Sequence, residues 1–218
     1  QKLGKKQKIL IKLIADNGIS YKGQEGGFSL AELGDLIKEL QALENITIAG
    51  LTAFPCWLYS ASAKKIMPTE NVKLLHDAQQ ILQRLGYKYL QLNMPSANAH
   101  CSIDDIAAAG ATHIEVGHGL TGTTPAHAYH FDLAEIPAMA YLSEISHYYQ
   151  SRSYFYGGGC YRRYPISRAL VGRSISNCSL IDVDKFDLEN IDYYFATPHQ
   201  FEIGESVIAS FRTQVFVT

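Results

Sequence analysis

The sequence predicts an α/β protein in which an array of parallel βα units precedes a mainly antiparallel β region. Two observations support this fold class. Over residues 1–135, apolar runs of strand length alternate with stretches of helical periodicity. From about residue 136 onward, short runs rich in Tyr, Val, Ile and Phe are separated by glycine and asparagine, which favours antiparallel strands. We therefore expect two domains, residues 1–135 and residues 136–218.

The first two βα units begin with strands predicted over residues 8–15 and 46–54. Ser29 and Glu32 fit a capping box at the start of the first helix, and Thr69 fits the N-cap of the second. Gly86 ends the second helix. The expected buried faces carry aliphatic residues at helical spacing, which are Leu33, Leu36, Ile37 and Leu40 in the first helix and Val72, Leu75, Ala78, Leu82 and Leu85 in the second.

Two further strands are predicted over residues 87–94 and 111–116, with a short helix between them that Ser102 and Asp105 would cap. Residues 55–68 are predicted to form a long loop. In the second domain, strands are expected within residues 139–150, 151–156, 179–183 and 206–217. Because ligands collect at the C-terminal ends of parallel strands, a site is expected where the first four strands end.

Composition excludes several function classes. The chain has 218 residues, 47% of them hydrophobic, and a net charge of -2, which argues against a nucleic-acid or membrane-surface partner. No apolar run is long enough to span a bilayer. The four cysteines form no close pairs, so we expect a reducing, cytoplasmic compartment. The first residue is not Met and a strand-like run lies near each end, so we expect a fragment of a longer protein.

The stretch after the fourth strand, residues 115–125, is the strongest functional signal. Gly117, Gly119 and Gly122 allow backbone N–H groups to turn toward one point, and three threonines add hydroxyl donors. This pattern favours an anion cradle, most often for phosphate. A tight glycine-rich connection without a ligand is the alternative. Glu115 precedes the loop, and we expect its carboxylate to be buried and to meet a cationic partner.

Two strand-end strings and one loop carry a resemblance to a known family. The strings are Asn93-Met94-Pro95-Ser96 and Glu115-Val116-Gly117-His118, and the loop reads VGHGLTGTTP over residues 116–125. With residues 144–147 (EISH) and 157–159 (GGG), they resemble the alanine-racemase-like pyridoxal-phosphate (PLP) enzymes of fold type III, closest to the YhfX-like branch. The resemblance implies the second half of a PLP-binding (β/α)8-type barrel followed by part of a mainly antiparallel β domain.

The same resemblance assigns roles to individual residues. It implies that Ser96 contacts the PLP phosphate and that Gly117 and His118 offer backbone donors to it. Asp16 and residues 23–27 match a segment that lines the active site near the substrate, and Lys12 matches a supporting lysine. The cofactor-binding residues implied in this way are Ser96, Glu115, Gly117, His118, Gly119, Thr121, Gly122 and Thr123.

Two departures from the family pattern limit the predicted reaction. Alanine racemases place an arginine opposite the pyridine nitrogen, whereas Glu115 stands here, as in the related basic amino-acid decarboxylases. A carboxylate favours a protonated ring, which is the stronger electron sink, so the protein need not be a plain alanine racemase, and decarboxylation, elimination and racemisation of another amino acid all stay open. The family's PLP lysine lies on the first barrel strand, which this chain lacks, so we expect the fragment itself to be inactive.

The resemblance implies a homodimer in which the β domain of the partner subunit supplies a second acid/base group to the active site. Cys160 and Tyr161, which follow the GGG segment, are the candidates for this group. A packed hairpin turn is the alternative. Three other functions compete: a PLP-binding protein without turnover, a phosphosugar barrel, and a metal site. The candidate metal ligands are His118, His127, His130, Glu144, His147 and Cys160. No two of these histidines have the i,i+4 spacing of a helical zinc site.

Overall fold

The computed structural model describes residues 5–16, 18–128, 130, 132–158, 166–185, 189 and 191–209. The chain divides into two compact units. Unit 1 comprises residues 1–98 and 102–116, and unit 2 comprises residues 99–101 and 117–218. Each unit has its own hydrophobic core. The predicted boundary between residues 135 and 136 falls inside unit 2, and as a boundary between functional domains it stays a prediction.

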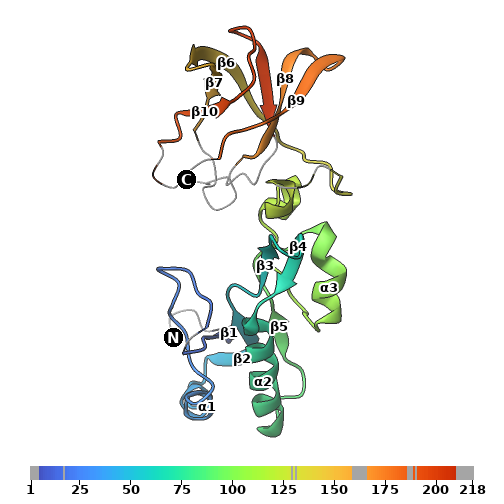
Figure 1. The fold of residues 1–218 in the computed structure, drawn as a ribbon. Helices are drawn as coiled ribbons and strands as arrows, with labels where there is room; N and C mark the ends of the chain where they lie inside the picture. Colours follow the sequence, from blue (N-terminus) through green and yellow to red (C-terminus); the bar gives the residue numbers. More distant parts are fainter. Residues whose placement is uncertain are drawn as a thin grey trace. The chain divides into compact units, whose positions relative to one another are not determined.

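Unit 1 contains a three-stranded parallel sheet in the order β1 (Gln7–Leu13), β2 (Ile46–Ala53) and β5 (Gln91–Asn93), as Figure 1 shows. Helices α1 (Leu33–Gln41) and α2 (Glu70–Arg84) connect these strands. A single parallel bridge between Asn93 and His113 continues the series. The predicted strand over residues 111–116 is thus reduced to one bridge. The sheet establishes parallel βα units, but three strands do not by themselves establish half of an eight-stranded barrel.

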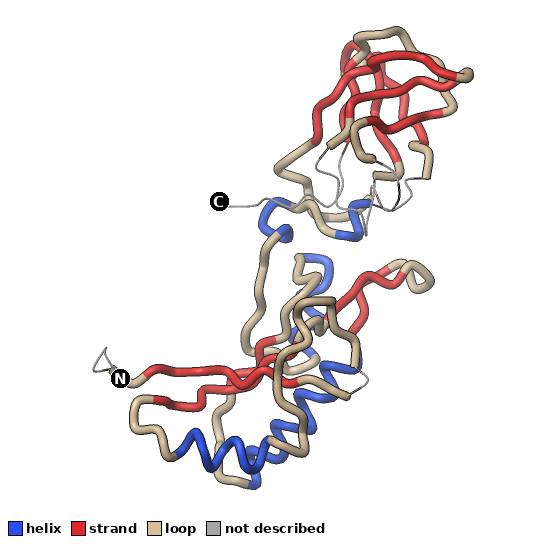
Figure 2. Tube along the Cα trace, turned by 90° about the vertical axis from the view of Figure 1, so that its left-hand side faces the viewer, coloured by secondary structure: helices blue, strands red, loops and turns tan. Residues whose placement is uncertain are grey.

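The two faces of this sheet differ in polarity because side chains alternate along each strand. Ile11, Leu51 and Leu92 lie in register and are buried in one core with residues of both helices. Figure 2 shows the two long helices on one side of the strands. The next register row, Lys12, Thr52 and Asn93, belongs to the opposite face. The helix-free face therefore carries a polar row at its C-terminal end.

The caps of the long helices follow the sequence prediction in part. Thr69 caps α2, because its Oγ1 accepts from the N–H of Asn71 (3.2 Å) and donates to the Pro55 carbonyl (2.7 Å). Ser29 and Glu32 form the predicted reciprocal hydrogen bonds, but α1 itself begins only at Leu33.

Two local predictions are wrong. Residues 55–68 are not simply a loop, because β3 (Trp57–Ser60) and β4 (Lys65–Pro68) pair there as an antiparallel hairpin. The Ser102–Asp105 capping pair does not form: α3 (Ile103–Ala108) follows a 3-10 turn over His100–Ser102, and the Ser102 hydroxyl donates to the Ala97 carbonyl instead.

From residue 117 onward, unit 2 has two 3-10 turns, His118–Thr121 and Pro125–Ala128, followed by a six-stranded antiparallel sheet. Figure 1 shows this sheet strongly curled. Ile145, Phe155, Val171, Phe195 and Val207 are buried in its core. Its strand order is β10 (Tyr194–Thr197), β7 (Arg152–Tyr156), β6 (Tyr141–Tyr149), β11 (Ser206–Ala209), β8 (Arg168–Ser174) and β9 (Asn177–Asp182).

The antiparallel character of this region is as predicted. Strands β8 and β10 were not expected from the sequence, and the expected strand over residues 206–217 is described only to Ala209. Within the described part of the chain, no helix is both long and apolar enough to cross a membrane.

Candidate functional site

Glu115 is held by two asparagine side chains at the C-terminal end of the parallel sheet. Asn93 Nδ2 donates to Glu115 Oε1 (2.7 Å) and lies 3.1 Å from Thr52 Oγ1. The Glu115 N–H donates to Asn98 Oδ1 (3.0 Å), and Asn98 is itself fixed because its Nδ2 donates to the Met94 carbonyl (3.0 Å). Both asparagines are buried. Asn93 therefore orients the Glu115 carboxylate, and Asn98 fixes the Glu115 backbone, so the carboxylate is held by an amide rather than by an opposite charge.

The expectation that Glu115 is buried is wrong. Its side chain is exposed, and among the described residues it bonds amides and forms no ion pair. Because water reaches the carboxylate, the predicted need for a cationic partner within the chain does not arise. The charge still affects a neighbour: burial, with a contribution from Glu115, raises the pKa of the Cys56 thiol to about 12. Cys56 therefore stays a neutral thiol.

Ser96 lies in a strained turn between β5 and α3. Ser96 and Ala97 both have positive φ, 82° and 46°. Each left-handed residue other than glycine costs roughly 1 kcal/mol, so the turn is maintained by surrounding bonds such as that from Ser102 Oγ to the Ala97 carbonyl (3.1 Å). Ser96 is half-buried, and the described residues give its hydroxyl no hydrogen-bond partner. The turn therefore presents a free hydroxyl near the end of β5.

A cavity of about 310 Å³ lies where β1 and β2 end, within unit 1. Backbone N–H groups of Glu25 and Gly23 bond the Glu25 carboxylate and lower its pKa. Lys12 Nζ donates to the Gln24 carbonyl (2.6 Å), which ties the loop of residues 18–28 to β1. The cavity is lined in part by Leu13, Asp16, Ile19, Glu25, Phe54 and Asn71. Asp16, predicted to line the site near the substrate, is thus at a cavity wall.

The Gly/Thr loop, residues 117–124, belongs to unit 2, and the hydroxyls of Thr121 and Thr123 bond each other within the loop. Thr121 Oγ1 donates to the His118 carbonyl (2.9 Å) and lies 2.8 Å from Thr123 Oγ1. The Thr123 N–H donates to the same carbonyl (3.2 Å), and Thr123 is fully buried. These contacts give the threonine hydroxyls a part in fixing the loop's shape.

Two glycines of the loop differ in what they require. Gly122 has a φ of 67°, and a Cβ there would lie 2.9 Å from the Ile136 carbonyl oxygen, so both its conformation and its packing demand glycine. A Cβ at Gly117 would meet nothing within 4 Å. The described chain therefore leaves open space beside the backbone of Gly117, which lies two residues after Glu115 in the sequence.

Several predicted site residues are not brought into this picture. Cys160 and Tyr161 lie outside the described residues. Among the residues that the structure describes, no three His, Cys, Asp or Glu side chains converge where a metal ion would be held. Sequence reasoning missed the roles of Thr52 and Asn98. Only the spacing of Asn98 two residues after Ser96 hinted at a shared turn.

A family model and a curated relative both relate this chain to YhfX. A family model described as "YhfX-like, C-terminal domain" matches residues 140–218. The chain is 41% identical over 221 residues to the uncharacterized protein YhfX of Escherichia coli K12. That alignment covers 100% of the chain and 56% of YhfX, so the chain spans little more than half of this relative's length.

Solved structures show the same fold at low sequence identity. AQ1208 from Aquifex aeolicus gives a TM-score of 0.58 at 14% identity, over 97% of this chain and 53% of that one. An arginine decarboxylase of Paramecium bursaria Chlorella virus gives 0.57 at 15% identity, over 97% and 61%. The alanine racemase of Corynebacterium glutamicum gives 0.54 at 14% identity, over 95% and 59%.

These matches confirm the resemblance found in the sequence. The structures establish an alanine-racemase-like fold, and the match to YhfX runs the whole length of the chain. Residues 140–218 match the model of the YhfX-like C-terminal domain, and the chain as a whole is similar to YhfX.

Proposed function

We propose that the full-length protein is a PLP-dependent enzyme of racemase-like type that acts at the Cα of a small amino acid. The observation that carries this proposal is Glu115, which immediately precedes the Gly/Thr loop in the sequence: buried Asn93 bonds its carboxylate and buried Asn98 bonds its backbone N–H. The fold shared with an alanine racemase and an arginine decarboxylase supports it. We further propose that unit 1 is part of the second half of a PLP-binding barrel, because its strands are parallel and neighbours in chain order.

The residues present fit PLP in three respects. An ionised carboxylate suits a protonated pyridine nitrogen. The Ser96 hydroxyl is free to donate to a phosphate oxygen. The open space at Gly117 allows a ligand to approach the backbone, and an alanine side chain there would narrow this space.

In the proposed mechanism, PLP supplies the electron sink for charge that develops at the amino-acid Cα. Glu115 would keep a proton at the ring nitrogen, with Asn93 orienting its carboxylate and Asn98 fixing its backbone. Ser96 and the backbone N–H groups of Gly117 and His118 would hold the phosphate. Gly119, Thr121, Gly122 and Thr123 maintain the shape of that loop.

Further proposals concern the substrate and the proton transfers. The cavity beside Asp16 and Glu25 would receive the substrate. Cys160 or Tyr161, supplied by the second subunit of a homodimer, would remove or return the Cα proton.

Decarboxylation or elimination is the second candidate reaction. Glu115 favours it, because a protonated ring stabilises a carbanion whichever bond to Cα breaks. The arginine decarboxylase among the structural neighbours shows that this fold accommodates such an enzyme.

The test uses the full-length protein purified with added PLP. We expect a visible absorption band from cofactor attached to a lysine, lost on borohydride reduction, with the modified lysine found by mass spectrometry. Exchange of the Cα proton in deuterium oxide, followed by NMR over a panel of D- and L-amino acids, then identifies the substrate. Absence of the band would overturn the proposal.

Two variants isolate the role of Glu115. Glu115→Gln keeps the hydrogen bonds to Asn93 and Asn98 possible but removes the charge. We expect it to retain PLP within a few-fold and to lose at least tenfold in Cα exchange, about 1.4 kcal/mol of transition-state stabilisation. Thr47→Ala, an exposed position on β2, is the control. Equal loss of cofactor binding and exchange would contradict this role.

A further inference from the structure

His127 is a buried histidine that the proposed function does not use. Only 4% of it is exposed, and its two ring nitrogens contact two different parts of unit 2. Nδ1 lies 3.1 Å from the N–H nitrogen of Thr124 and 2.9 Å from its Oγ1, at the end of the Gly/Thr loop. Nε2 lies 3.3 Å from the carbonyl oxygen of Glu135. His127 thus links the loop to a stretch of chain eight residues further on.

These contacts assign the protonation of the ring. A backbone N–H can only donate, so Nδ1 accepts the hydrogen bond from Thr124 and carries no proton. The neutral ring then carries its proton on Nε2, which donates to the Glu135 carbonyl. The Thr124 hydroxyl likewise donates to Nδ1. Both nitrogens are therefore used, each in one fixed sense.

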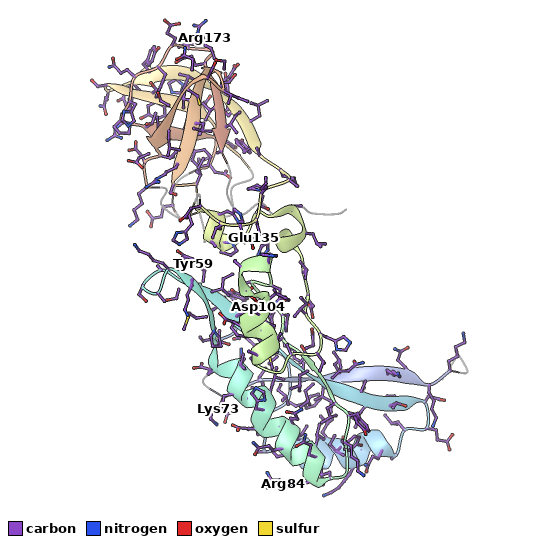
Figure 3. All side chains as sticks on the ribbon, turned by 90° about the vertical axis from the view of Figure 1, so that its right-hand side faces the viewer. Tyr59, Lys73, Arg84, Asp104, Glu135 and Arg173 are labelled. Atoms are coloured by element: carbon purple, nitrogen blue, oxygen red, sulfur yellow. The ribbon has the colours of Figure 1, made fainter. Side chains whose placement is uncertain are left out.

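The stretch of residues 135–138, called here the backing segment, lies against the Gly/Thr loop. The Ala138 N–H donates to the Thr121 carbonyl (2.8 Å), and Gly122 approaches Ile136 so closely that no side chain fits. The Glu135 carboxylate accepts the Cys101 N–H (2.6 Å), which anchors the segment in turn. Figure 3 labels Glu135 beside the short helical turns of this region. His127 supplies the link at the loop's far end, Thr124.

We propose that His127 is the positioning residue of the phosphate loop. By accepting from Thr124 at Nδ1 and donating to Glu135 at Nε2, it holds the Gly/Thr loop on the backing segment in the shape that receives a phosphate group. This inference rests on the proposed function, in which that loop binds the PLP phosphate. His127 itself does not touch the ligand.

The test compares two ligands that differ only in the phosphate. Pyridoxamine 5′-phosphate and pyridoxamine both lack the aldehyde, so neither forms a covalent bond with lysine. Their dissociation constants for the full-length protein are measured by fluorescence titration. The wild-type protein should bind the phosphate form at least tenfold more tightly, about 1.4 kcal/mol.

Two substitutions separate the two ring nitrogens. His127→Asn places an amide oxygen near the position of Nδ1 and keeps the acceptor for Thr124, whereas His127→Gln places an amide N–H near Nε2 and keeps only the link to Glu135. We expect His127→Gln to weaken the phosphate ligand at least tenfold and pyridoxamine less than twofold. His127→Asn, which breaks the link to Glu135 instead, should likewise weaken the phosphate ligand at least tenfold and pyridoxamine less than twofold. His76→Gln, on α2 in unit 1, is the matched control.

The outcomes separate the two proposals. If the wild type does not prefer the phosphate ligand, the phosphate role of the loop fails, and the role of His127 fails with it. If the wild type prefers it and His127→Gln keeps that preference, or weakens both ligands equally, only the positioning role is overturned. A measurement that needs no variant is ¹⁵N NMR of the His127 ring, which should show an unprotonated Nδ1 and a protonated Nε2. The reverse pattern would also overturn it.

Discussion

Ser96 has a left-handed backbone conformation that costs stability, and the turn presents its hydroxyl as a functional group. Ser96 and the following Ala97 both have positive φ, which disfavours every residue with a Cβ. Glycine at position 96 would adopt the same turn without this cost. A serine retained there places a free hydroxyl at the end of β5, where we propose that the phosphate binds.

Replacing Ser96 with glycine should therefore change stability and binding in opposite directions. We expect Ser96→Gly to raise the free energy of unfolding by up to about 1 kcal/mol, measured by urea denaturation. The same variant should bind pyridoxamine 5′-phosphate several-fold more weakly, because a donor to the phosphate is lost.

The neighbouring Ala97→Gly is the control for the backbone effect. It relaxes the second left-handed residue but removes a buried methyl group, so its stability should change little and its ligand affinity should not change. Unaltered phosphate binding in Ser96→Gly would exclude Ser96 as a phosphate ligand.

At the scale of elements, the contact between residues 99–101 and the backing segment depends on the Glu135 carboxylate. Burial alone would raise its pKa, but the hydrogen bonds that it accepts, chiefly from Cys101 and from its own backbone N–H, together outweigh that effect and lower the pKa. The same contact acts on the thiol in the other sense: burial and the Glu135 charge raise the pKa of Cys101 to about 12. Although Cys101 as a residue is exposed, its thiol lies against the Glu135 carboxylate and is thereby kept in its neutral, unreactive form.

Cys101 should consequently react slowly with iodoacetamide. At pH 8 a thiol of this pKa is ionised in roughly one molecule in 10,000, and only the thiolate reacts. Glu135→Gln removes the negative charge and should increase alkylation of Cys101 at least tenfold, as measured by peptide mass spectrometry. Cys178 is also exposed and serves as the internal control, because its rate should not change. Equal rates for Cys101 and Cys178 in the wild type would contradict the proposed contact.

The predictability of the elements follows from how local their signals are. Strands β1 and β2 and helices α1 and α2 carry periodic apolar patterns that need no partner to be recognised. The β3–β4 hairpin was missed because its two strands have four residues each and no glycine turn between them. In the strand expected over residues 111–116, only His113 forms a bridge to the neighbouring strand. A β-branched run in the sequence does not reveal how many of its residues pair with a neighbour.

The candidate site was predictable to a similar extent. The glycine spacing of the Gly/Thr loop and the strand-end position of Glu115 are visible in the sequence. The support of Glu115 by Asn93 and Asn98 is not, because Asn98 reaches it only through a turn of two left-handed residues. The exposure of Glu115 was likewise hidden, since burial depends on what covers a strand end rather than on the strand's own residues.

At the scale of the whole molecule, the sheet of unit 2 presents an exposed aliphatic row. Leu142, Ile208, Leu170 and Leu180 are direct register partners across β6, β11, β8 and β9, so they share one face. Their exposed fractions range from 40% to 73%. A contiguous apolar surface of this kind marks an interaction site in a soluble protein. It is the surface through which we expect the proposed homodimer to form.

Charges introduced into this row should dissociate the dimer. We expect the chain to sediment as a dimer and the double variant Leu170→Lys/Ile208→Lys to dissociate with at least a tenfold larger dissociation constant, because two lysines would be desolvated on association. Both positions are exposed, so the free energy of unfolding of the monomer should change by less than about 1 kcal/mol. Leu43→Lys, at an equally exposed leucine of unit 1, should leave sedimentation unchanged. A wild-type monomer, or a double variant that remains as dimeric as the wild type, would show that subunits do not associate through this face.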